Sequence, residues 1–134
     1  MTENNTIVFK QGLPGYENLR NFILTHPSED YPIFSLNSVE DQSVSFMVIN
    51  PFQFDKNYSF ELTTYAEEFL QIENPSSLVV FTIINCHKGL EQATVNLKAP
   101  IVVNGENRHG VQVVLEQPYN IQEPLKAFLQ RAEE

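Results

Sequence analysis

The sequence contains little cysteine, little positive charge and no long apolar run. Its one cysteine, Cys86, excludes an internal disulfide and a cysteine-rich zinc site. Eight lysine and arginine residues against seventeen aspartate and glutamate residues give a net charge of −9. This balance argues against direct nucleic-acid binding, which needs basic side chains to displace counterions, and against an anionic membrane surface. No apolar run approaches the roughly 20 residues of a membrane span.

The composition is that of a folded chain. Hydrophobic residues make up 42% of the 134 residues and aromatic residues 11%, which argues against disorder. The length suits one domain, residues 1–134, that can bury a core without a metal ion or a disulfide. The polar, acidic start of the chain is unlike a signal peptide, so we expect a protein of the reducing cytoplasm. The negative charge favours solubility and association with a basic partner.

Alternation of apolar and polar residues predicts short antiparallel strands with one face in water. The expected strands are residues 44–49, 58–62, 94–98 and 111–116, with further candidates at 6–10, 22–26, 32–37 and 99–104. Residues 78–84 are almost all apolar and predict a central strand that is buried on both faces. Turns such as Gly12-Leu13-Pro14-Gly15 separate these runs, and Leu13 is expected to enter the core. The predicted fold class is all-β: a compact antiparallel β-barrel-like domain, closed to hide its strand edges, with one or two short helices.

Two short helices are expected. Thr64 and Glu67 have the spacing of a capping box, which predicts a helix of about two turns. A second helix is expected over about residues 123–133, with Pro124 at its first helical position. Its apolar stripe is formed by Leu125, Phe128, Leu129 and Ala132. This stripe can pack on the domain itself or in a groove of a partner, and packing on the domain is favoured because an uncovered stripe is a liability.

No reaction centre is visible in the sequence. His26, His87 and His109 lack the spacing that presents two imidazoles to one metal ion, and His26 and His109 are expected in solvent. Cys86 and His87 are neighbours at the end of a strand, so their side chains point to opposite faces and do not form a nucleophile with its base. The sequence contains neither a nucleophile-elbow motif nor a phosphate-binding glycine motif. We therefore expect no catalytic residue, no metal, no cofactor and no enzymatic activity.

An acidic β domain without a reaction centre points to a binding protein. The alternative is a small-ligand-binding β-barrel protein that holds a metabolite in its interior. The apolar density of residues 78–84 argues against a roomy interior, because small barrels fill with side chains. A hydrolase with an unrecognised site is a third possibility, which turnover abolished by Cys86→Ala would support.

Five stretches resemble, in order, segments of the flagellar assembly factor FliW family. They are Ile7-Val8-Phe9 with Gly12-Leu13-Pro14-Gly15-Tyr16-Glu17; Pro32-Ile33-Phe34 with Leu36 and Ser38; Asn50-Pro51-Phe52 with Phe54, Tyr58, Phe60 and Leu62; Asn96-Leu97-Lys98-Ala99-Pro100-Ile101-Val102-Val103-Asn104; and Gly110-Val111-Gln112-Val113-Val114-Leu115. The resemblance covers residues 7–119 and does not include the helix expected at 123–133. Each stretch alone is weakly specific, but five in order at near-family spacing are specific.

The resemblance implies an all-β fold, no enzymatic activity and two protein partners. One partner is flagellin, the filament subunit. The other is CsrA, a small basic dimeric RNA-binding protein that represses flagellin translation. The resemblance also implies partner exchange: unassembled flagellin holds the protein, and secretion of flagellin frees it to bind CsrA and relieve repression. The chain is then a cytoplasmic, chaperone-like regulator of flagellar assembly and of translation, without direct contact to nucleic acid or membrane.

Two groups of residues are candidates for partner binding. The first is acidic and suits a basic partner; it comprises Glu40, Asp41, Glu67, Glu68 and Glu106, with Glu116 as a further member. The second surrounds a proline that cannot donate to a ladder and so suggests an irregular strand edge. It comprises Asn96, Pro100, Ile101 and Asn104. We expect the negative field of the bound protein to repel RNA, so that occupancy and charge together antagonise CsrA.

Overall fold

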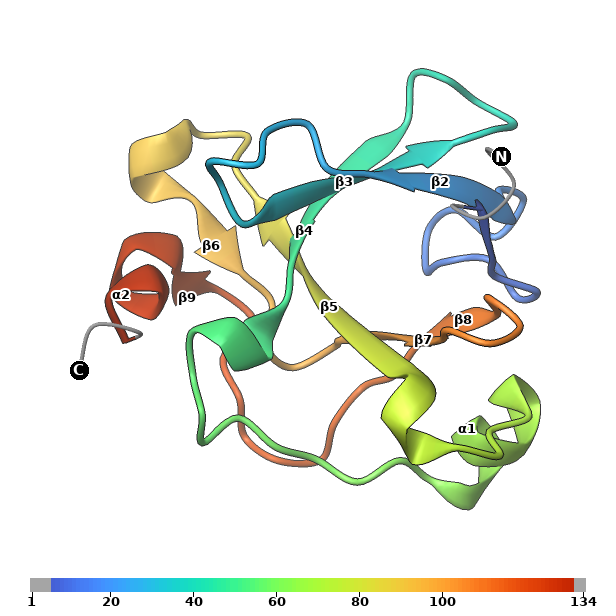
Figure 1. Ribbon diagram of the computed structural model, residues 1–134. Coiled ribbons are helices and arrows are strands. Elements are labelled where there is room, and N and C mark those ends of the chain that lie inside the picture. The colour runs from blue at the N-terminus through green and yellow to red at the C-terminus, as the bar shows by residue number, and fades with distance from the viewer. Residues whose placement is uncertain (1–5, 132–134) are drawn as a thin grey trace.

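The computed structural model describes residues 6–131, which form one antiparallel sheet with short helices at its margins (Figure 1). The strands are β1 (Thr6–Val8), β2 (Asn21–Thr25), β3 (Ile33–Ser38), β4 (Ser45–Ile49), β5 (Leu78–Asn85), β6 (Thr94–Val95), β7 (Ile101–Asn104), β8 (Gly110–Gln112) and β9 (Glu123–Pro124). The helices are α1 (Thr64–Leu70) and α2 (Leu125–Gln130), with short 3₁₀ turns at Pro51–Gln53, Pro75–Ser77 and Leu90–Gln92. The all-β fold class predicted from the sequence is confirmed.

The long strand β5 organises the sheet. The strand order is β1-β2-β3-β4-β5-β6-β9, and β7 and β8 branch from β5. The branch arises because the first half of β5, Leu78 to Phe81, pairs with β7, whereas its second half pairs with β4 and β6. The prediction of a central strand is thus confirmed. Burial on both faces is limited to its middle, since Val79 keeps 37% of its surface exposed.

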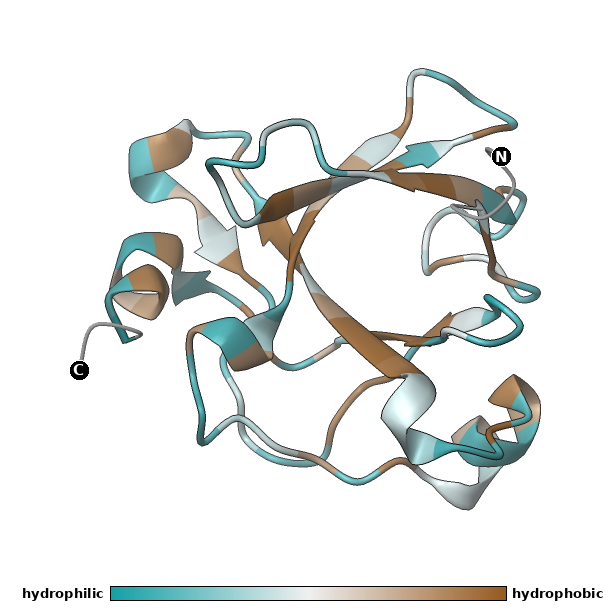
Figure 2. Cartoon of the chain, in the orientation of Figure 1, coloured by the Kyte–Doolittle hydropathy of each residue, from teal (hydrophilic) through white to brown (hydrophobic). Residues whose placement is uncertain are grey.

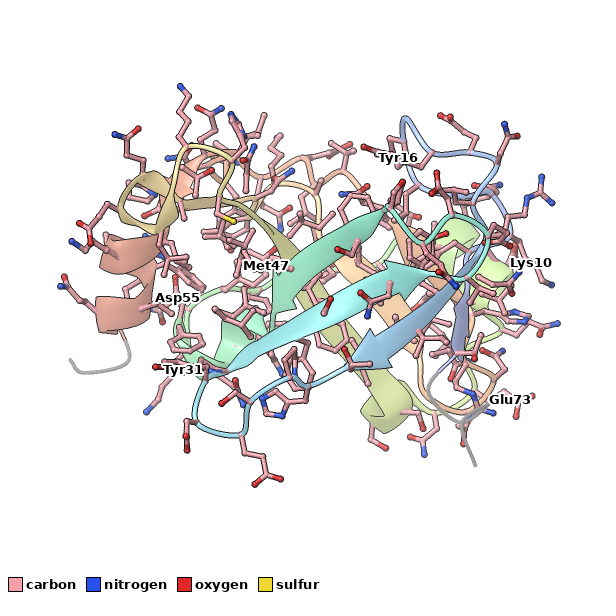
Figure 3. The ribbon with its side chains drawn as sticks, turned by 90° about the horizontal axis from the view of Figure 1, so that it is seen from above. Lys10, Tyr16, Tyr31, Met47, Asp55 and Glu73 are labelled. Atoms are coloured by element: carbon pink, nitrogen blue, oxygen red, sulfur yellow. The ribbon has the colours of Figure 1, made fainter. Side chains whose placement is uncertain are left out.

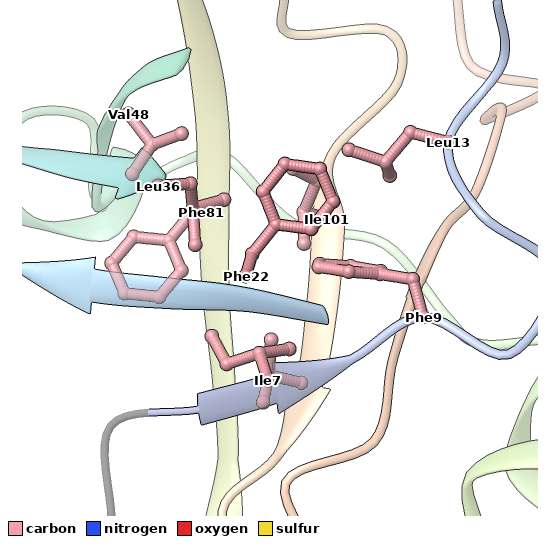
Figure 4. Close-up of a cluster of buried hydrophobic side chains, with 9 residues drawn as sticks. Ile7, Phe9, Leu13, Phe22, Leu36, Val48, Phe81 and Ile101 are labelled. Atoms are coloured by element: carbon pink, nitrogen blue, oxygen red, sulfur yellow. The ribbon is translucent and has the colours of Figure 1, made fainter. Parts of the chain in front are cut away.

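Strands β1 to β5, together with β7 and β8, curl around a shared apolar interior (Figures 1 and 4). The interior is filled by Ile7, Phe9, Leu13, Phe22, Leu36, Val48, Phe81, Ile101 and Val103. Leu13 enters the core as predicted. Figure 2 shows that β2, β5 and β7 are largely apolar, whereas the connecting loops are mostly hydrophilic.

The two ends of this curled sheet meet at a single point. An isolated parallel bridge joins Val8 to His109, and the Val8 N–H donates to the carbonyl oxygen of Arg108 at 2.9 Å. Within residues 6–131, no ladder joins β1 to β8. The domain is therefore barrel-like in a loose sense, and the closure predicted from the sequence is reached only through this bridge.

Helix α2 packs on its own domain, as favoured from the sequence. Leu125 and Phe128 are buried in a second apolar cluster that includes residues of β4, β5 and β6. The helix begins later than predicted, because Pro124 pairs in β9 and acts as the N-cap instead of occupying the first helical position. Ala132 and the remainder of the predicted range lie outside the described residues.

Arg131, at the end of α2, forms ion pairs with Asp55 and with Glu123 of β9. Its Nη1 lies 2.6 Å from Oδ2 of Asp55, and its Nη2 lies 2.6 Å from Oε2 of Glu123. Figure 3 shows Asp55 beside α2, whereas Lys10 and Glu73 lie at the other end of the molecule. The half-buried ion pairs thus hold the C-terminal helix against the flank of the sheet.

Helix α1 is capped one residue earlier than predicted. The Oγ1 atom of Thr63 accepts a hydrogen bond from the Ala66 N–H at 3.1 Å, so Thr63 is the N-cap and the predicted capping box of Thr64 with Glu67 is wrong. Two adjacent threonines offer the same chemistry, and only the backbone geometry decides which one caps. Glu67 still lies in the first turn, where the helix dipole favours a negative charge.

Several expected strands are shortened or absent: the strand expected at 6–10 ends at Val8, and the one expected at 99–104 begins at Ile101. Residues 58–62 form no ladder, residues 94–98 pair only at Thr94–Val95, and the strand expected at 111–116 ends at Gln112. Side chains replace the missing ladder around residue 58. The hydroxyl of the buried Tyr58 donates to the Leu97 carbonyl at 2.8 Å. The Tyr119 hydroxyl accepts from the Ser59 N–H at 3.1 Å and donates to the Ser59 carbonyl at 3.0 Å.

The histidines differ in their surroundings. His26 is exposed, as expected, and stacks on Phe34. The expectation that His109 lies in solvent is wrong, because its Nδ1 is buried and forms no hydrogen bond with the described residues. Burial lowers the pKa of His109, and the positive charge of Lys10 lowers this pKa further. The sequence could not predict this, because the burial comes from the contact of β1 with the end of the β7–β8 hairpin.

Candidate functional site

Two segments that lie largely outside the ladders of the sheet line a groove of about 1160 Å³. One comprises residues 59–63, which lead into α1, and the other comprises residues 111–117, which begin in β8 and continue beyond it. We call this hollow the strand groove; Gln11, Tyr65 and Ala66 complete its lining. Figure 1 shows both segments on the same side of the molecule, below β5. A second hollow of about 570 Å³ shares residues 59–62 and is otherwise lined by Phe52, Glu67, Pro75, Leu78, Val80 and Val102.

The backbone of the second segment is bonded on one side only. The N–H of Val113 donates to the Pro100 carbonyl at 3.0 Å, and the N–H of Leu115 donates to the Lys98 carbonyl at 2.8 Å. Between and beyond these two donors, the backbones of Val114 and Glu116 form no hydrogen bond with any described residue. The segment therefore continues the edge of the sheet past the end of β8.

The backbone of the first segment is likewise unpaired. Phe60, Glu61 and Leu62 form no backbone hydrogen bond within the described part of the chain. The segment is nevertheless held at both ends, by the Tyr119 hydroxyl at Ser59 and by the helix cap at Thr63. The strand groove thus has two fixed walls with free backbone donors and acceptors.

The side chains around the strand groove are apolar or acidic. Val114 is 72% exposed and Tyr65 is 61% exposed, which places two large apolar side chains in water at the rim. Glu61 and Glu116 are the charged residues of its lining, and neither lysine nor arginine contributes to either hollow. Such a surface suits a ligand with apolar and positively charged groups.

Three of the acidic residues predicted for partner binding are brought together. Glu67 and Glu68 are exposed on α1, and Glu106 is exposed in the turn between β7 and β8. The turn is bonded to the end of α1, since the side-chain amides of Asn104 and Asn107 both donate to the Leu70 carbonyl, at 2.9 and 3.1 Å. These contacts place the β7–β8 turn against the end of α1, and Glu67 also lines the second hollow.

The other predicted acidic pair lies elsewhere, in the loop between β3 and β4. Asn21 donates from its side chain to Oε2 of Glu40 at 2.7 Å, and this hydrogen bond lowers the pKa of Glu40. The hydroxyl and the N–H of Ser43 both donate to Oδ1 of Asp41, which lowers the pKa of Asp41. Both carboxylates are exposed and remain charged at neutral pH, so they form an acidic patch separate from that of α1.

Pro100 suggested an edge or a bulge from the sequence, and the structure contradicts the edge. Strand β7 pairs with β5 on one side and with β8 on the other, so it lies inside the sheet. Pro100 and Ile101 are buried, and Asn96 uses its Oδ1 to accept from the N–H groups of Lys98 and Ala99. These side chains shape the loop and the core in this conformation.

Asn104, also predicted for partner binding, forms hydrogen bonds within the domain. It is almost fully buried, and its amide group donates to the carbonyls of Leu70 and Gln71 while its Oδ1 accepts from the N–H of Glu106. It therefore caps the C-terminal end of α1 from a distant strand. The signal available in the sequence, an asparagine before glycine at the end of an apolar run, indicates a turn but not this contact.

The structure gives no support to the chemical alternatives. Among residues 6–131, no group of three histidine, cysteine or acidic residues is placed to hold a metal ion. Cys86 is partly buried beside the second cluster, and the His87 ring contacts the side chain of Asn85. Aromatic and aliphatic side chains fill the curled sheet, so a metabolite does not fit in its interior. In the described part of the chain, the helices are too short to cross a membrane.

Sequence reasoning missed the strand groove itself. It assigned residues 58–62 and 111–116 to ordinary strands and placed only Glu116 among the candidates for binding. The only sequence signal of the groove is the alternation of apolar and polar residues in these two ranges. Alternation indicates an extended segment but does not show whether that segment pairs with another strand.

Comparison with known proteins agrees with the motifs. A family model described as FliW protein matches residues 1–125. The flagellar assembly factor FliW of Caldanaerobacter subterraneus subsp. tengcongensis is 38% identical over 132 residues, which cover 97% of this chain and 88% of that protein. The flagellar assembly factor FliW of Thermosipho africanus is 38% identical over 130 residues, covering 96% and 90%. A crystal structure of the flagellar assembly factor FliW superposes with a TM-score of 0.84 at 30% identity, covering 93% of this chain and 88% of that one. The chain therefore belongs to the FliW family of flagellar assembly factors.

Proposed function

We propose that this protein is a non-enzymatic cytoplasmic regulator that binds flagellin and, when flagellin is secreted, binds and antagonises CsrA. Antagonism of CsrA relieves the repression of flagellin translation, so that synthesis of the subunit follows its export. Membership of the FliW family is the observation that carries this proposal. The net charge of −9 supports it, because CsrA is expected to be basic.

The acidic residues at α1 and at the β7–β8 turn are the proposed source of repulsion toward RNA. Two like charges about 8 Å apart cost only about 0.5 kcal/mol in water, and salt screens them further. Several such pairs acting together exceed about 1.4 kcal/mol, which is a tenfold loss of RNA affinity. Glu67, Glu68 and Glu106 are exposed and lie on adjoining elements, so they suit this role.

RNA binding by purified CsrA, measured with and without this protein across a salt series, tests the mechanism. We expect the antagonism to weaken as salt rises while the protein complex remains intact. Antagonism that is undiminished at high salt, with the complex still present by sedimentation, would show that charge repulsion is not the mechanism.

A pair of variants locates the charge. Glu67→Gln with Glu68→Gln should weaken the antagonism at low salt more than Glu29→Gln with Asp30→Asn, a matched neutralisation of two exposed carboxylates between β2 and β3. Equal effects of the two pairs would assign the repulsion to net charge rather than to α1. Titration of CsrA and then of flagellin into this protein tests the binding itself, and absence of heat and of a complex with both would overturn the proposed function.

A further inference from the structure

The open edge beyond β8 is shaped to receive a strand. In an extended chain, successive residues direct their backbone N–H and C=O groups to opposite sides. Val113 and Leu115 direct theirs toward Pro100 and Lys98, so Val114, which lies between them, directs its groups away from the sheet and toward the strand groove. The chain then bends at Glu116. The backbone groups of Val114 have no partner among the described residues, and the residue is 72% exposed.

The opposite wall of the strand groove offers a second set of free backbone groups. Phe60 and Leu62 turn their side chains into the apolar clusters, whereas Glu61 is exposed. The backbones of these residues are extended and unpaired, yet they are fixed at Ser59 and Thr63. Two extended walls with unpaired donors and acceptors match a strand, since a helix satisfies its own backbone and would leave the walls unpaired.

The side chains of the groove define the composition of that strand. The rim contributes the apolar surfaces of Val114 and Tyr65, and the charges of the lining come from Glu61 and Glu116 alone. A strand with alternating apolar and basic side chains would cover the apolar surfaces of the rim and neutralise the two glutamates. An acidic occupant would place like charges together at short range.

We propose that the strand groove binds an extended segment of a partner polypeptide by β-augmentation, and that this segment alternates apolar with lysine or arginine residues. The segment adds to the edge formed by residues 113–115 and bonds to the backbone of Val114. The inference goes beyond the partner exchange proposed above, because it specifies a mode of recognition and does not depend on which protein supplies the segment.

The test uses the full chain and a fluorescent peptide of about ten residues that alternates valine with lysine, which is long enough to span the groove. Anisotropy should report saturable binding, and a peptide of the same length that alternates valine with glutamate should bind at least about tenfold more weakly. N-methylation of alternate amides along one edge of the valine–lysine peptide should weaken binding to the same extent, because it removes ladder donors. Absence of saturable binding, or indifference to N-methylation along either edge, would overturn the proposal.

Variants of the groove provide the matched comparison. Val114→Pro removes the N–H that a partner strand would use, whereas Val114→Thr retains it, and both substitutions lie at a highly exposed position. We expect at least about a tenfold loss of peptide affinity for Val114→Pro and less than about a threefold change for Val114→Thr. Glu61→Gln with Glu116→Gln should lower the affinity and reduce its dependence on salt. Equal affinities of the proline and threonine variants would overturn the proposal.

Hydrogen exchange of the unmodified protein gives a readout that does not depend on the folding of a variant. The bound peptide should slow exchange of the Val114 amide more than that of the exposed amides between β2 and β3. Unchanged exchange at Val114 under saturating peptide would contradict the proposal. If the peptide binds but neither CsrA nor flagellin does, the strand-binding proposal is supported and the proposed function is overturned. If CsrA and flagellin bind but the peptide does not, the proposed function is supported and the strand-binding proposal is overturned.

Discussion

The curled sheet and the strand-groove side of this protein contain similar alternating sequence but satisfy their backbones in different ways. Strands β2, β3 and β4 pair along their whole lengths and send one set of side chains into the interior. Residues 59–63 and 113–115 form no ladder and rely on hydroxyl and loop contacts, and part of their backbone is left free. The backbone hydrogen bonds of the curled sheet are therefore formed within the chain, whereas those of the groove side would be completed by the strand proposed to bind there. Stability should depend on the first region and recognition on the second.

The largest expected effect lies in the curled sheet. Phe22 is fully buried and makes an edge contact with Phe9, with ring centroids 5.5 Å apart. Phe22→Ala should lower the free energy of unfolding by about 3–5 kcal/mol, because it leaves a cavity among close-packed rings. Val114→Ala, at the rim of the strand groove, should change it by less than about 0.5 kcal/mol. Chemical denaturation measures the free energy of unfolding of both variants. Comparable decreases would show that Val114 contributes to stability as much as a core residue does.

The sheet was the more predictable of the two regions for a physical reason. Alternation in residues 44–49 and short apolar runs in residues 22–26 and 32–37 mark strands, and short connections between neighbouring strands leave few other pairings. The lengths of these strands followed to within a residue or two. The closing bridge between Val8 and His109 did not follow, because it joins two ends of the sheet that are distant in sequence.

The candidate site was less predictable because its shape depends on distant side chains. Ser59 is held by Tyr119, which lies 60 residues further along the chain. Without that contact, the alternation at residues 58–62 indicates a strand like any other. The acidic residues could be identified from composition, but only the bonds of Asn104 to α1 show that Glu106 lies near Glu67 and Glu68.

The next effect tests how the groove side is joined to the sheet. Asn104→Ala removes an amide that donates to the Leu70 carbonyl at 2.9 Å in a buried setting, and it should cost about 1–3 kcal/mol of unfolding free energy. Asn107→Ala removes a donor to the same carbonyl from a less buried position and should cost less. Thermal or chemical unfolding of both variants measures the difference. A loss for Asn107→Ala that equals or exceeds that for Asn104→Ala would contradict the role of Asn104 as the main cap of α1.

A smaller effect separates the two tyrosines that replace the missing ladder. Tyr58→Phe leaves the Leu97 carbonyl without its buried donor and should cost about 1 kcal/mol. Tyr119→Phe frees the backbone of Ser59, which is exposed and can bond to water, so its cost should stay below about 0.5 kcal/mol. Burial and the neighbouring Tyr119 raise the pKa of Tyr58, so a spectroscopic alkaline titration should show Tyr58 ionising later than the exposed tyrosines. Ionisation of every tyrosine in a single ordinary step would contradict this burial.

The smallest effect concerns the seam where the curled sheet nearly closes. Burial and the charge of Lys10 lower the pKa of His109 below its usual 6.5, so the unfolded chain binds a proton more readily than the folded protein. The stability that His109 contributes is therefore complete above about pH 6.5, falls as the pH drops toward the lowered pKa, and is constant below it. Denaturation between about pH 7.5 and 5 should show a steeper loss for the unmodified protein than for His109→Gln, which cannot titrate in this range. Titration of the His109 ring protons by NMR measures the pKa directly, and Lys10→Gln should raise it toward the usual value. A pKa of His109 at or above 6.5, or an equal dependence of stability on pH for the two proteins, would show that the imidazole lies in water and would contradict the contact between β1 and the β7–β8 hairpin.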